Sequence, residues 1–398
     1  MQVPRFEPFA ALRYSPSLPL DRVAAPPYDV LSDADVDGLL ARHPRNIVAI
    51  DVPRESDGPG RYDDAARRLV EWLDDGTLVR DPEPSFTLYR MRFTDETGAT
   101  RETVGVLGAL EVVDEGAAGV LPHERTTPKA KTDRLDLTRS THANLSPVWG
   151  LSLTPGLTDI LREPGEPIGE CHDEHGVVHV VERVSDPARV AAISTAVGSS
   201  PVLIADGHHR YAISRIFRDE VRADHGDRTG AELTLTYVAE LVDEQLSIDA
   251  IHRLYRGPDA GRLLDVLAAS FDTAEAGEVT PSFAREVVER GSLCLVRPDG
   301  TGVWLRPKTS AFEGVRALDG AYLEHAMRDT DVDVTYQHGV QLVVDRVRSG
   351  EVEAGVLIRP TSITEIRRTA DERLLMPPKS TFFTPKLRTG LVLRDLGL

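Results

Sequence analysis

Cysteine is almost absent from this sequence. Its 398 residues include two cysteines, Cys171 and Cys294, which lie far apart along the chain. Two cysteines are too few for a cysteine-ligated metal cluster, and small secreted domains stabilised by disulfides contain more of them at closer spacing. The sequence therefore excludes cysteine metal clusters, and we do not expect a disulfide framework.

Long apolar runs are also missing. No run approaches the roughly 18 residues that a membrane-spanning helix needs, and the first residues of the sequence carry no apolar secretion segment. We therefore expect no membrane partner, and a cytoplasmic location is the default.

Positive charge is scarce relative to negative charge. The sequence contains 46 Lys and Arg residues against 64 Asp and Glu residues, which gives a formal net charge of −18. Such an acidic surface repels nucleic acids and anionic lipids unless basic residues are gathered in a patch. We expect no nucleic-acid partner, and clusters of basic residues stand out against this background.

Three widespread catalytic motifs are absent from the sequence. It contains no G-x-x-x-x-G-K-[ST] phosphate loop, no G-x-S-x-G nucleophile elbow and no H-E-x-x-H zinc helix. The pair His123-Glu124 is followed by Arg125-Thr126-Thr127, so the second histidine of a zinc helix is missing.

The most informative motif is Asp206-Gly207-His208-His209-Arg210. An apolar run at 201–204 predicts a buried strand before it, and the spacing of 212–217 predicts a helix after it. Backbone N–H groups at the start of a helix favour anions, and a glycine lets a ligand approach the backbone closely. Because arginine can hold a phosphate with two hydrogen bonds, the motif predicts a phosphate site. The alternative is a helix capped by Asp206 with solvated histidines.

A second cluster follows a short apolar pair, at Pro122-His123-Glu124. Glu124 after a strand suits a general base or a magnesium ligand. From 123 to 139 the basic residues outnumber the acidic ones, for a local charge of +2. The basic members are Arg125, Lys129, Lys131, Arg134 and Arg139. An anion-binding patch is one interpretation, and a solvated helix face with ion pairs four residues apart is the other.

Two further segments complete the candidates. The segment 373–388 contains Arg373, Lys379, Lys386 and Arg388 and no acidic residue, and its turn around Lys379-Ser380 suits an ordered loop. It is either part of an anion site or a basic surface loop. Near the start of the sequence, Pro26-Pro27 predicts a rigid turn that presents Tyr28 and Asp29.

Helix and strand patterns alternate along the chain, which predicts a mixed α/β fold. We expect helices over 33–42, 61–75, 129–143, 186–197, 263–271 and 340–348. We expect strands over 86–93, 103–113, 147–153, 177–184, 233–241, 248–254, 292–296, 302–305 and 355–358. A chain of this length exceeds one compact core, so we divide it into an N-terminal α/β region (1–115), a core that carries both motifs (116–230) and a C-terminal α/β region (231–398).

With these motifs, the chain resembles the DUF1015 family of uncharacterised proteins from end to end. The matching stretches are Pro26 to Val30, His43-Pro44, His123 to Thr126, Lys131 to Leu135, Asn144 to Pro147, Asp206 to Tyr211 and Lys379 to Thr381.

The middle segment also resembles the free L-serine kinases of the ParB/sulfiredoxin superfamily. Those enzymes carry a P-H-E segment after a strand and a D-G-H-x-R segment that opens a helix. The resemblance implies a ParB/sulfiredoxin-like nucleotide-binding core with N-terminal and C-terminal additions. It implies that Glu124 is the catalytic base, with His123 beside it, and that Asp206 to Arg210 hold the nucleotide phosphates. The insertion between the two motifs is longer here, so the lid and substrate pocket are expected to differ.

The resulting hypothesis is a kinase that uses ATP or ADP with Mg²⁺, held by Asp206, to phosphorylate a small hydroxyl substrate such as free L-serine. Further substrate or phosphate contacts are expected from Arg125, Thr126, Lys131, Arg134, Tyr28, Lys379 and Ser380. The alternatives are a ParB-like nucleotide-binding switch or adaptor, or a phosphatase that uses the same site. A sulfiredoxin-like reductase would need a cysteine where His208 stands. The expected partners are nucleotide and small-molecule substrate, and a homodimer is a candidate assembly.

Overall fold

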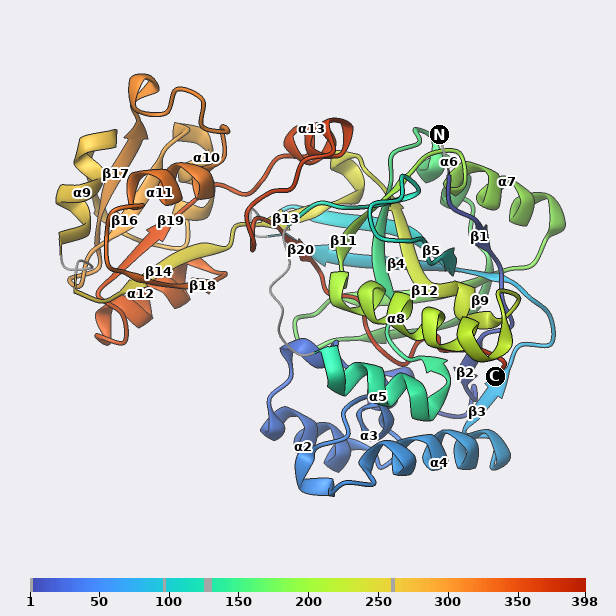
Figure 1. Ribbon diagram of the computed structural model, residues 1–398. Helices are drawn as coiled ribbons and strands as arrows, with labels where there is room; N and C mark the ends of the chain where they lie inside the picture. Colours follow the sequence, from blue (N-terminus) through green and yellow to red (C-terminus); the bar gives the residue numbers. More distant parts are fainter. Residues whose placement is uncertain (1–2, 96–97, 125–130, 259–261) are drawn as a thin grey trace. The chain divides into compact units, whose positions relative to one another are not determined.

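The computed structural model describes residues 3–95, 98–124, 131–258 and 262–398, and only the backbone at 131–132 (Figure 1). The predicted site residues Arg125 and Thr126, and the side chain of Lys131, lie outside the described part. Among the residues that the structure describes, no helix combines the length and the apolar composition needed to cross a membrane.

The chain divides into two compact units. Unit 1 consists of residues 1–94, 100–246 and 385–398, and unit 2 consists of residues 95–99 and 247–384. Unit 2 is therefore an insertion into unit 1, and the last residues of the chain return to unit 1. Apart from residues 95–99, the predicted regions 1–115 and 116–230 both fall in unit 1, where their strands share one sheet.

Unit 1 is built on a nine-stranded mixed sheet with the strand order β6-β11-β8-β12-β5-β4-β10-β9, and β1 pairs with β5 outside this path. Its strands are β1 (Phe6–Glu7), β4 (Phe86–Thr94), β5 (Thr100–Glu111), β6 (Val120–Pro122), β8 (Val148–Ser152), β9 (Glu166–His172), β10 (Val178–Val184), β11 (Val202–Asp206) and β12 (Leu233–Glu240). The pairs β6–β11 and β8–β12 are parallel, and the other neighbours along the path are antiparallel. Two short ladders pair β2 (Leu12–Tyr14) with β3 (Leu78–Arg80) and β7 (Ala143–Asn144) with β21 (Arg394–Asp395).

Helices pack around this sheet in three apolar clusters. The helices of unit 1 are α1 (Leu20–Val23), α2 (Asp33–Arg42), α3 (Val48–Asp51), α4 (Arg61–Asp74), α5 (Lys131–Thr141), α6 (Leu157–Arg162), α7 (Pro187–Val197) and α8 (His208–His225). Leu161 of α6 and Ile193 of α7 pack on the main sheet beside Val106. A second cluster joins α2, α3 and α4 to β2 and β3. A third joins α5 to α8, which lie side by side with α4 beyond α5 (Figure 1).

Unit 2 contains a six-stranded sheet with the order β15-β17-β16-β19-β14-β18. Its strands are β14 (His252–Arg256), β15 (Phe271–Glu278), β16 (Leu293–Val296), β17 (Thr301–Pro307), β18 (Asp333–Gln337) and β19 (Ala354–Leu357). Its helices are α9 (Leu263–Ser270), α10 (Phe283–Arg290), α11 (Asp319–Ala326), α12 (Val340–Arg348) and α13 (Ile363–Glu372). Strand β13 (Ser247–Asp249) follows the change from unit 1 to unit 2 after residue 246, and β20 (Phe382–Thr384) precedes the return to unit 1 after residue 384. These two strands pair with each other.

The mixed α/β class predicted from the sequence is confirmed. The predicted helix after Ser32 is α2, and Ser32 accepts a hydrogen bond from the backbone N–H of Asp35 in a capping box. One strand expected over 248–254 is instead two, β13 and β14. The strand β15 was missed because it is an edge strand with mostly exposed residues, so its sequence lacks the apolar alternation of a buried strand.

Candidate active site

The two sequence motifs lie at the same edge of the main sheet. Strand β6 pairs with β11 in parallel, and Pro122 stands opposite Ile204. The carboxyl ends of parallel strands meet at one edge, and ligands of open α/β sheets bind in the crevice outside these ends. His123 and Glu124, which follow β6, are therefore brought to the end of β11, where Asp206 precedes α8.

Gly207 makes the turn from β11 into α8. Its backbone is left-handed, with φ 83° and ψ 27°, and a side chain there would lie 3.3 Å from the Cα of Val148. Glycine is favoured on both counts. The N-cap residue of α8 is Gly207, so Asp206 does not occupy the capping position that the alternative interpretation gave it.

Asp206 is paired with two cations. Lys386 Nζ lies 3.2 Å from its Oδ2, and Arg210 Nη2 lies 3.7 Å from the same oxygen. Burial raises the pKa of the Asp206 carboxyl, but the charges of Lys386 and Arg210 outweigh burial and hold the pKa well below its ordinary value. Asp206 is therefore ionised at neutral pH.

Arg210 is held by several groups at once. Its Nη1 donates to the carbonyl of Pro147, and its Nη2 lies 3.6 Å from Asp29. Its guanidinium is 5.9 Å from the ring centre of Tyr28, and its side chain is 11% exposed. Burial alone would lower the pKa of Arg210, but the charges of Asp206 and Asp29 reverse the effect, so it stays protonated.

A second polar group lies behind Arg210. The guanidinium of Arg134 lies 4.2 Å over the ring of Tyr28 and 3.2 Å from Asp51 Oδ1. Asp51 also accepts a hydrogen bond from the Ser146 hydroxyl at 3.2 Å. These residues and Arg210 line a cavity of about 50 Å³. A cavity of this size suits one or two water molecules rather than a nucleotide.

The two buried histidines of the site are neutral. The Nδ1–H of His123 donates to the backbone carbonyl of Ile204, and the rings of His123 and His208 lie 4.9 Å apart. Burial lowers the pKa of His123 to about 4, and it is the largest cause that lowers the pKa of His208 to about 3. A proton on one ring also disfavours a proton on the other. His123 Nε2 lies 3.9 Å from Glu124 Oε2, which places Glu124 at the end of this row.

We expect His123 to make stability depend on pH. Its pKa is about 4 in the folded protein and 6.5 ordinarily, so the unfolded chain binds the proton first. The contribution is complete above pH 6.5 and is lost as the pH falls toward 4, by up to about 3 kcal/mol. Denaturant unfolding measured between pH 7 and pH 4 checks this: the stability of His123→Asn should fall less steeply than that of the wild type.

His225 offers a matched control for that measurement. It is exposed at the last residue of α8, so His225→Asn makes the same substitution away from the buried histidine pair. If the slope of His123→Asn equals that of the wild type, the neutral state of His123 is wrong.

The structure brings some of the predicted contacts together. Tyr28 and Arg134 lie beside Arg210, as described above. Lys379 and Ser380 belong to unit 2, so their role at this site stays a prediction. His209 lies in the first turn of α8, and its proposed phosphate contact is likewise untested.

Three residues of the site were not predicted from the sequence. Lys386 was part of the basic segment 373–388 but was not chosen from it, and neither its neighbours nor its spacing set it apart. Ser146 lies in the Asn144 to Pro147 stretch that carries the family resemblance, which was a usable signal. Asp51 ends the short helix α3, and nothing local distinguishes it from the other aspartates.

The magnesium ion expected from the sequence would need ligands among the side chains of this site. Among the described residues, no group of three or more His, Cys, Asp or Glu side chains is arranged to hold a metal ion. Magnesium needs only one or two carboxylates when phosphate and water supply the remaining ligands. Asp206 is ionised and at the right edge of the sheet, so it fits this role once a phosphate is bound.

Several solved structures resemble this chain distantly. A conserved hypothetical protein from Pyrococcus furiosus has a TM-score of 0.37 and 14% identity, with 70% of this chain and 91% of that chain covered. A free serine kinase in complex with AMP has a TM-score of 0.38 and 14% identity over 70% and 88% of the two chains. SbnI from Staphylococcus aureus, truncated at its C-terminus, has a TM-score of 0.38 and 12% identity over 71% and 84%.

A comparison with curated proteins found no match. One family model does match, and its description is a protein of unknown function, DUF1015. The match covers residues 6–321 and includes both motifs of the site. Because this model spans more than half of the chain, the protein belongs to the DUF1015 family.

Proposed function

We propose that the protein is a nucleotide-dependent phosphotransferase that phosphorylates a small hydroxyl substrate, with free L-serine as the leading acceptor. The observation that carries the proposal is the parallel pairing of β6 with β11, which brings Glu124 to the edge where Asp206, Gly207 and Arg210 open α8. The motif resemblance to free serine kinases assigns the same two motifs to acceptor activation and phosphate binding.

Phosphoryl transfer needs mainly positioning and charge neutralisation from a protein. The backbone N–H groups at the start of α8 and the cations around Asp206 supply positive potential for the phosphates. In the reaction, the acceptor oxygen forms a bond to the terminal phosphorus of the donor. The bond from that phosphorus to the bridging oxygen breaks, and its electron pair leaves with the shortened nucleotide.

We assign Glu124 as the general base that accepts the proton of the acceptor hydroxyl. Its side chain is 18% exposed, so it is reachable from solvent while shielded on one side by His123. A carboxylate within hydrogen-bond reach of the hydroxyl takes its proton as the new bond forms. His123 is neutral and is tied to Ile204, so it orients the neighbourhood of Glu124 rather than accepting the proton itself.

Magnesium supplies further charge neutralisation on the phosphates when it is bound with the nucleotide. Asp206 is the residue of this chain that would hold it. Because the carboxylate stays ionised at low pH, its affinity for a cation is not limited by protonation in the working range.

The test is an assay of the full-length protein with ATP or ADP, Mg²⁺ and L-serine, in which O-phosphoserine is measured by mass spectrometry. Formation of a phosphorylated hydroxy amino acid with either donor is the expected result. If nucleotide binds and no hydroxy amino acid is phosphorylated, the kinase proposal is overturned. Release of inorganic phosphate from phosphoserine alone would point to the phosphatase alternative, and binding without turnover to the switch.

A further inference from the structure

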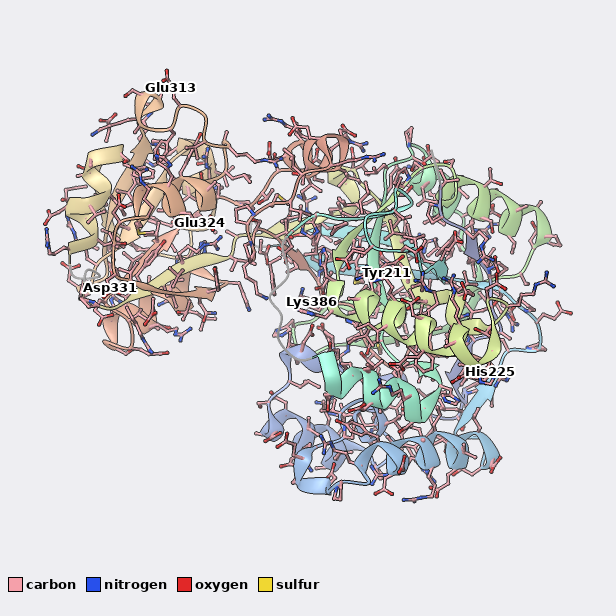
Figure 2. The ribbon with its side chains drawn as sticks, in the orientation of Figure 1. Tyr211, His225, Glu313, Glu324, Asp331 and Lys386 are labelled. Atoms are coloured by element: carbon pink, nitrogen blue, oxygen red, sulfur yellow. The ribbon has the colours of Figure 1, made fainter. Side chains whose placement is uncertain are left out.

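We propose that Lys386 is the lysine that binds the nucleotide phosphates, and that Asp206 holds its ammonium in position before the nucleotide arrives. The inference rests on the proposed nucleotide-binding function and adds a residue that neither motif contains. Lys386 reaches Asp206 from a segment 180 residues further along the chain. Figure 2 shows the side chain of Lys386 near the start of α8. Tyr211, labelled in the same view, belongs to the first turn of that helix.

The backbone around Lys386 is anchored in unit 1. Two residues later, the N–H of Arg388 donates to the Tyr89 hydroxyl at 3.1 Å. The next residue, Thr389, exchanges two backbone hydrogen bonds with Ala25, at 2.8 and 3.0 Å. Leu387 is buried. The side chain of Lys386 therefore extends from an anchored backbone, and its flexible four-carbon stem allows the ammonium to shift toward a ligand.

Elimination among the cations favours Lys386. Arg210 is charged, but its guanidinium is tied to Pro147, Asp29 and Asp206 and is 11% exposed. Lys386 is 21% exposed and lies against the same carboxylate. It is the better placed of the two cations to reach a phosphate from solvent.

An unsatisfied group at the same place also points to a ligand. His208 Nε2 is buried and has no hydrogen-bond partner in the described structure. A buried polar atom without a partner costs about 1–3 kcal/mol unless a ligand or water completes it. Since a neutral histidine whose Nε2 carries the proton is a donor, a phosphate oxygen would satisfy it. Lys386 contacts Asp206, and His208 is the first residue of the helix that follows it.

The amino acid type fits the task. Five of the 46 basic residues in the sequence are lysines, so arginine is the usual cation of this chain. Arginine presents a planar fork that binds one carboxylate or phosphate in a fixed geometry. Lysine is a compact charge with three donors that can exchange one oxygen partner for another. Exchange of Asp206 for a phosphate requires the second behaviour.

The first experiment labels the wild-type protein with an acyl-phosphate derivative of ATP. The Lys386 amine is expected to attack the acyl carbon, so that an amide bond forms, the anhydride bond breaks and the nucleotide phosphate leaves with its electron pair. Peptide mass spectrometry should find the label on Lys386 and find it reduced by excess ATP. Lys308, whose Nζ donates to the carbonyl of Ala268 in unit 2, is the internal control and should stay unlabelled.

The second experiment compares the affinities of Lys386→Met for ATP and for adenosine. Loss of one charged hydrogen bond is expected to weaken ATP binding roughly 10- to 100-fold and to leave adenosine binding unchanged. If Lys386 had only a structural role, the substitution would lower the affinity for both ligands. Lys386→Arg should recover part of the ATP affinity, and Lys308→Met should equal the wild type.

The outcomes separate the two proposals. If the wild type binds neither ATP nor ADP, the proposed function fails and this inference with it. If the wild type binds ATP while Lys386 is not labelled and Lys386→Met keeps its ATP affinity, this inference alone is overturned. Because the labelling uses the wild type, the result stands even if the variant does not fold.

Discussion

Glu124→Gln is expected to lower kcat for phosphorylation of the acceptor by about 10²- to 10⁴-fold, the range that a positioned general base contributes. The substitution keeps the shape of the side chain and removes its ability to accept a proton. Nucleotide affinity should stay unchanged, because the residues assigned to the phosphates lie at the start of α8 and on the C-terminal segment. Steady-state kinetics and a direct nucleotide-binding measurement on the same preparation check both halves.

Glu170 provides the matched control for this substitution. It is exposed on β9, at the opposite edge of the main sheet from β6. Glu170→Gln removes the same charge from the same unit and should leave kcat unchanged. Should Glu124→Gln turn over like the wild type, the proton goes to another group and the assignment of Glu124 is wrong.

Asp206→Asn is expected to have the second largest effect, a loss of about 100-fold in kcat/KM together with about 1–2 kcal/mol of stability. The stability loss follows from leaving Lys386 and Arg210 without their shared carboxylate, reduced because Asp206 is 31% exposed. The activity loss follows from removing the carboxylate that is assigned to Lys386 and magnesium. Kinetics and denaturant unfolding at neutral pH measure the two effects.

The pH dependence of stability below pH 4 provides a second test of the Asp206→Asn variant. The folded pKa of Asp206 lies below its ordinary value of 3.8, so its contribution is present above that pH and is lost as the pH falls through the folded pKa. Asp206→Asn should therefore lose less stability than the wild type on acidification below pH 4. Asp29→Asn, at the more exposed carboxylate beside Arg210, is the control and should show smaller effects on stability and on kcat/KM.

A double-mutant cycle distinguishes how Asp206 acts. If its only task is to position Lys386, adding Lys386→Met to Asp206→Asn should cost little further ATP affinity. If Asp206 also holds magnesium, the two losses should add in the presence of Mg²⁺ and overlap in its absence. If the losses of ATP affinity combine in the same way with and without Mg²⁺, Asp206 does not hold the magnesium ion.

Local patterns predicted the elements that carry the site. The apolar run before Asp206 and the spacing of 212–217 after the motif predicted a strand followed by a helix, and these are β11 and α8. The helix expected over 33–42 is α2, which Ser32 caps through its side chain. Each depends on neighbours in sequence, where backbone preferences and hydrogen-bonding side chains act directly.

Partners far apart in the sequence were not predictable in this way. Asp51 meets Arg134 and Ser146 because the N-terminal helices pack beside α5. Lys379 was preferred over Lys386 because it lies in a more distinctive turn, whereas the course of the chain places Lys386 on Asp206 and assigns Lys379 to unit 2. Burial also decides protonation, and the sequence alone gave no sign that the histidines would be neutral.

The sequence by itself determined the acidic surface, the mixed α/β class and the two short motifs, because composition and local periodicity suffice for these. Only the tertiary structure decided that the motifs share one edge. His123 and Ile204 are 81 residues apart and are joined by the parallel pairing of β6 and β11. Lys386 reaches Asp206 because the chain returns to unit 1 after an inserted unit. Strand pairing and chain return depend on contacts between distant residues, which a local pattern does not encode.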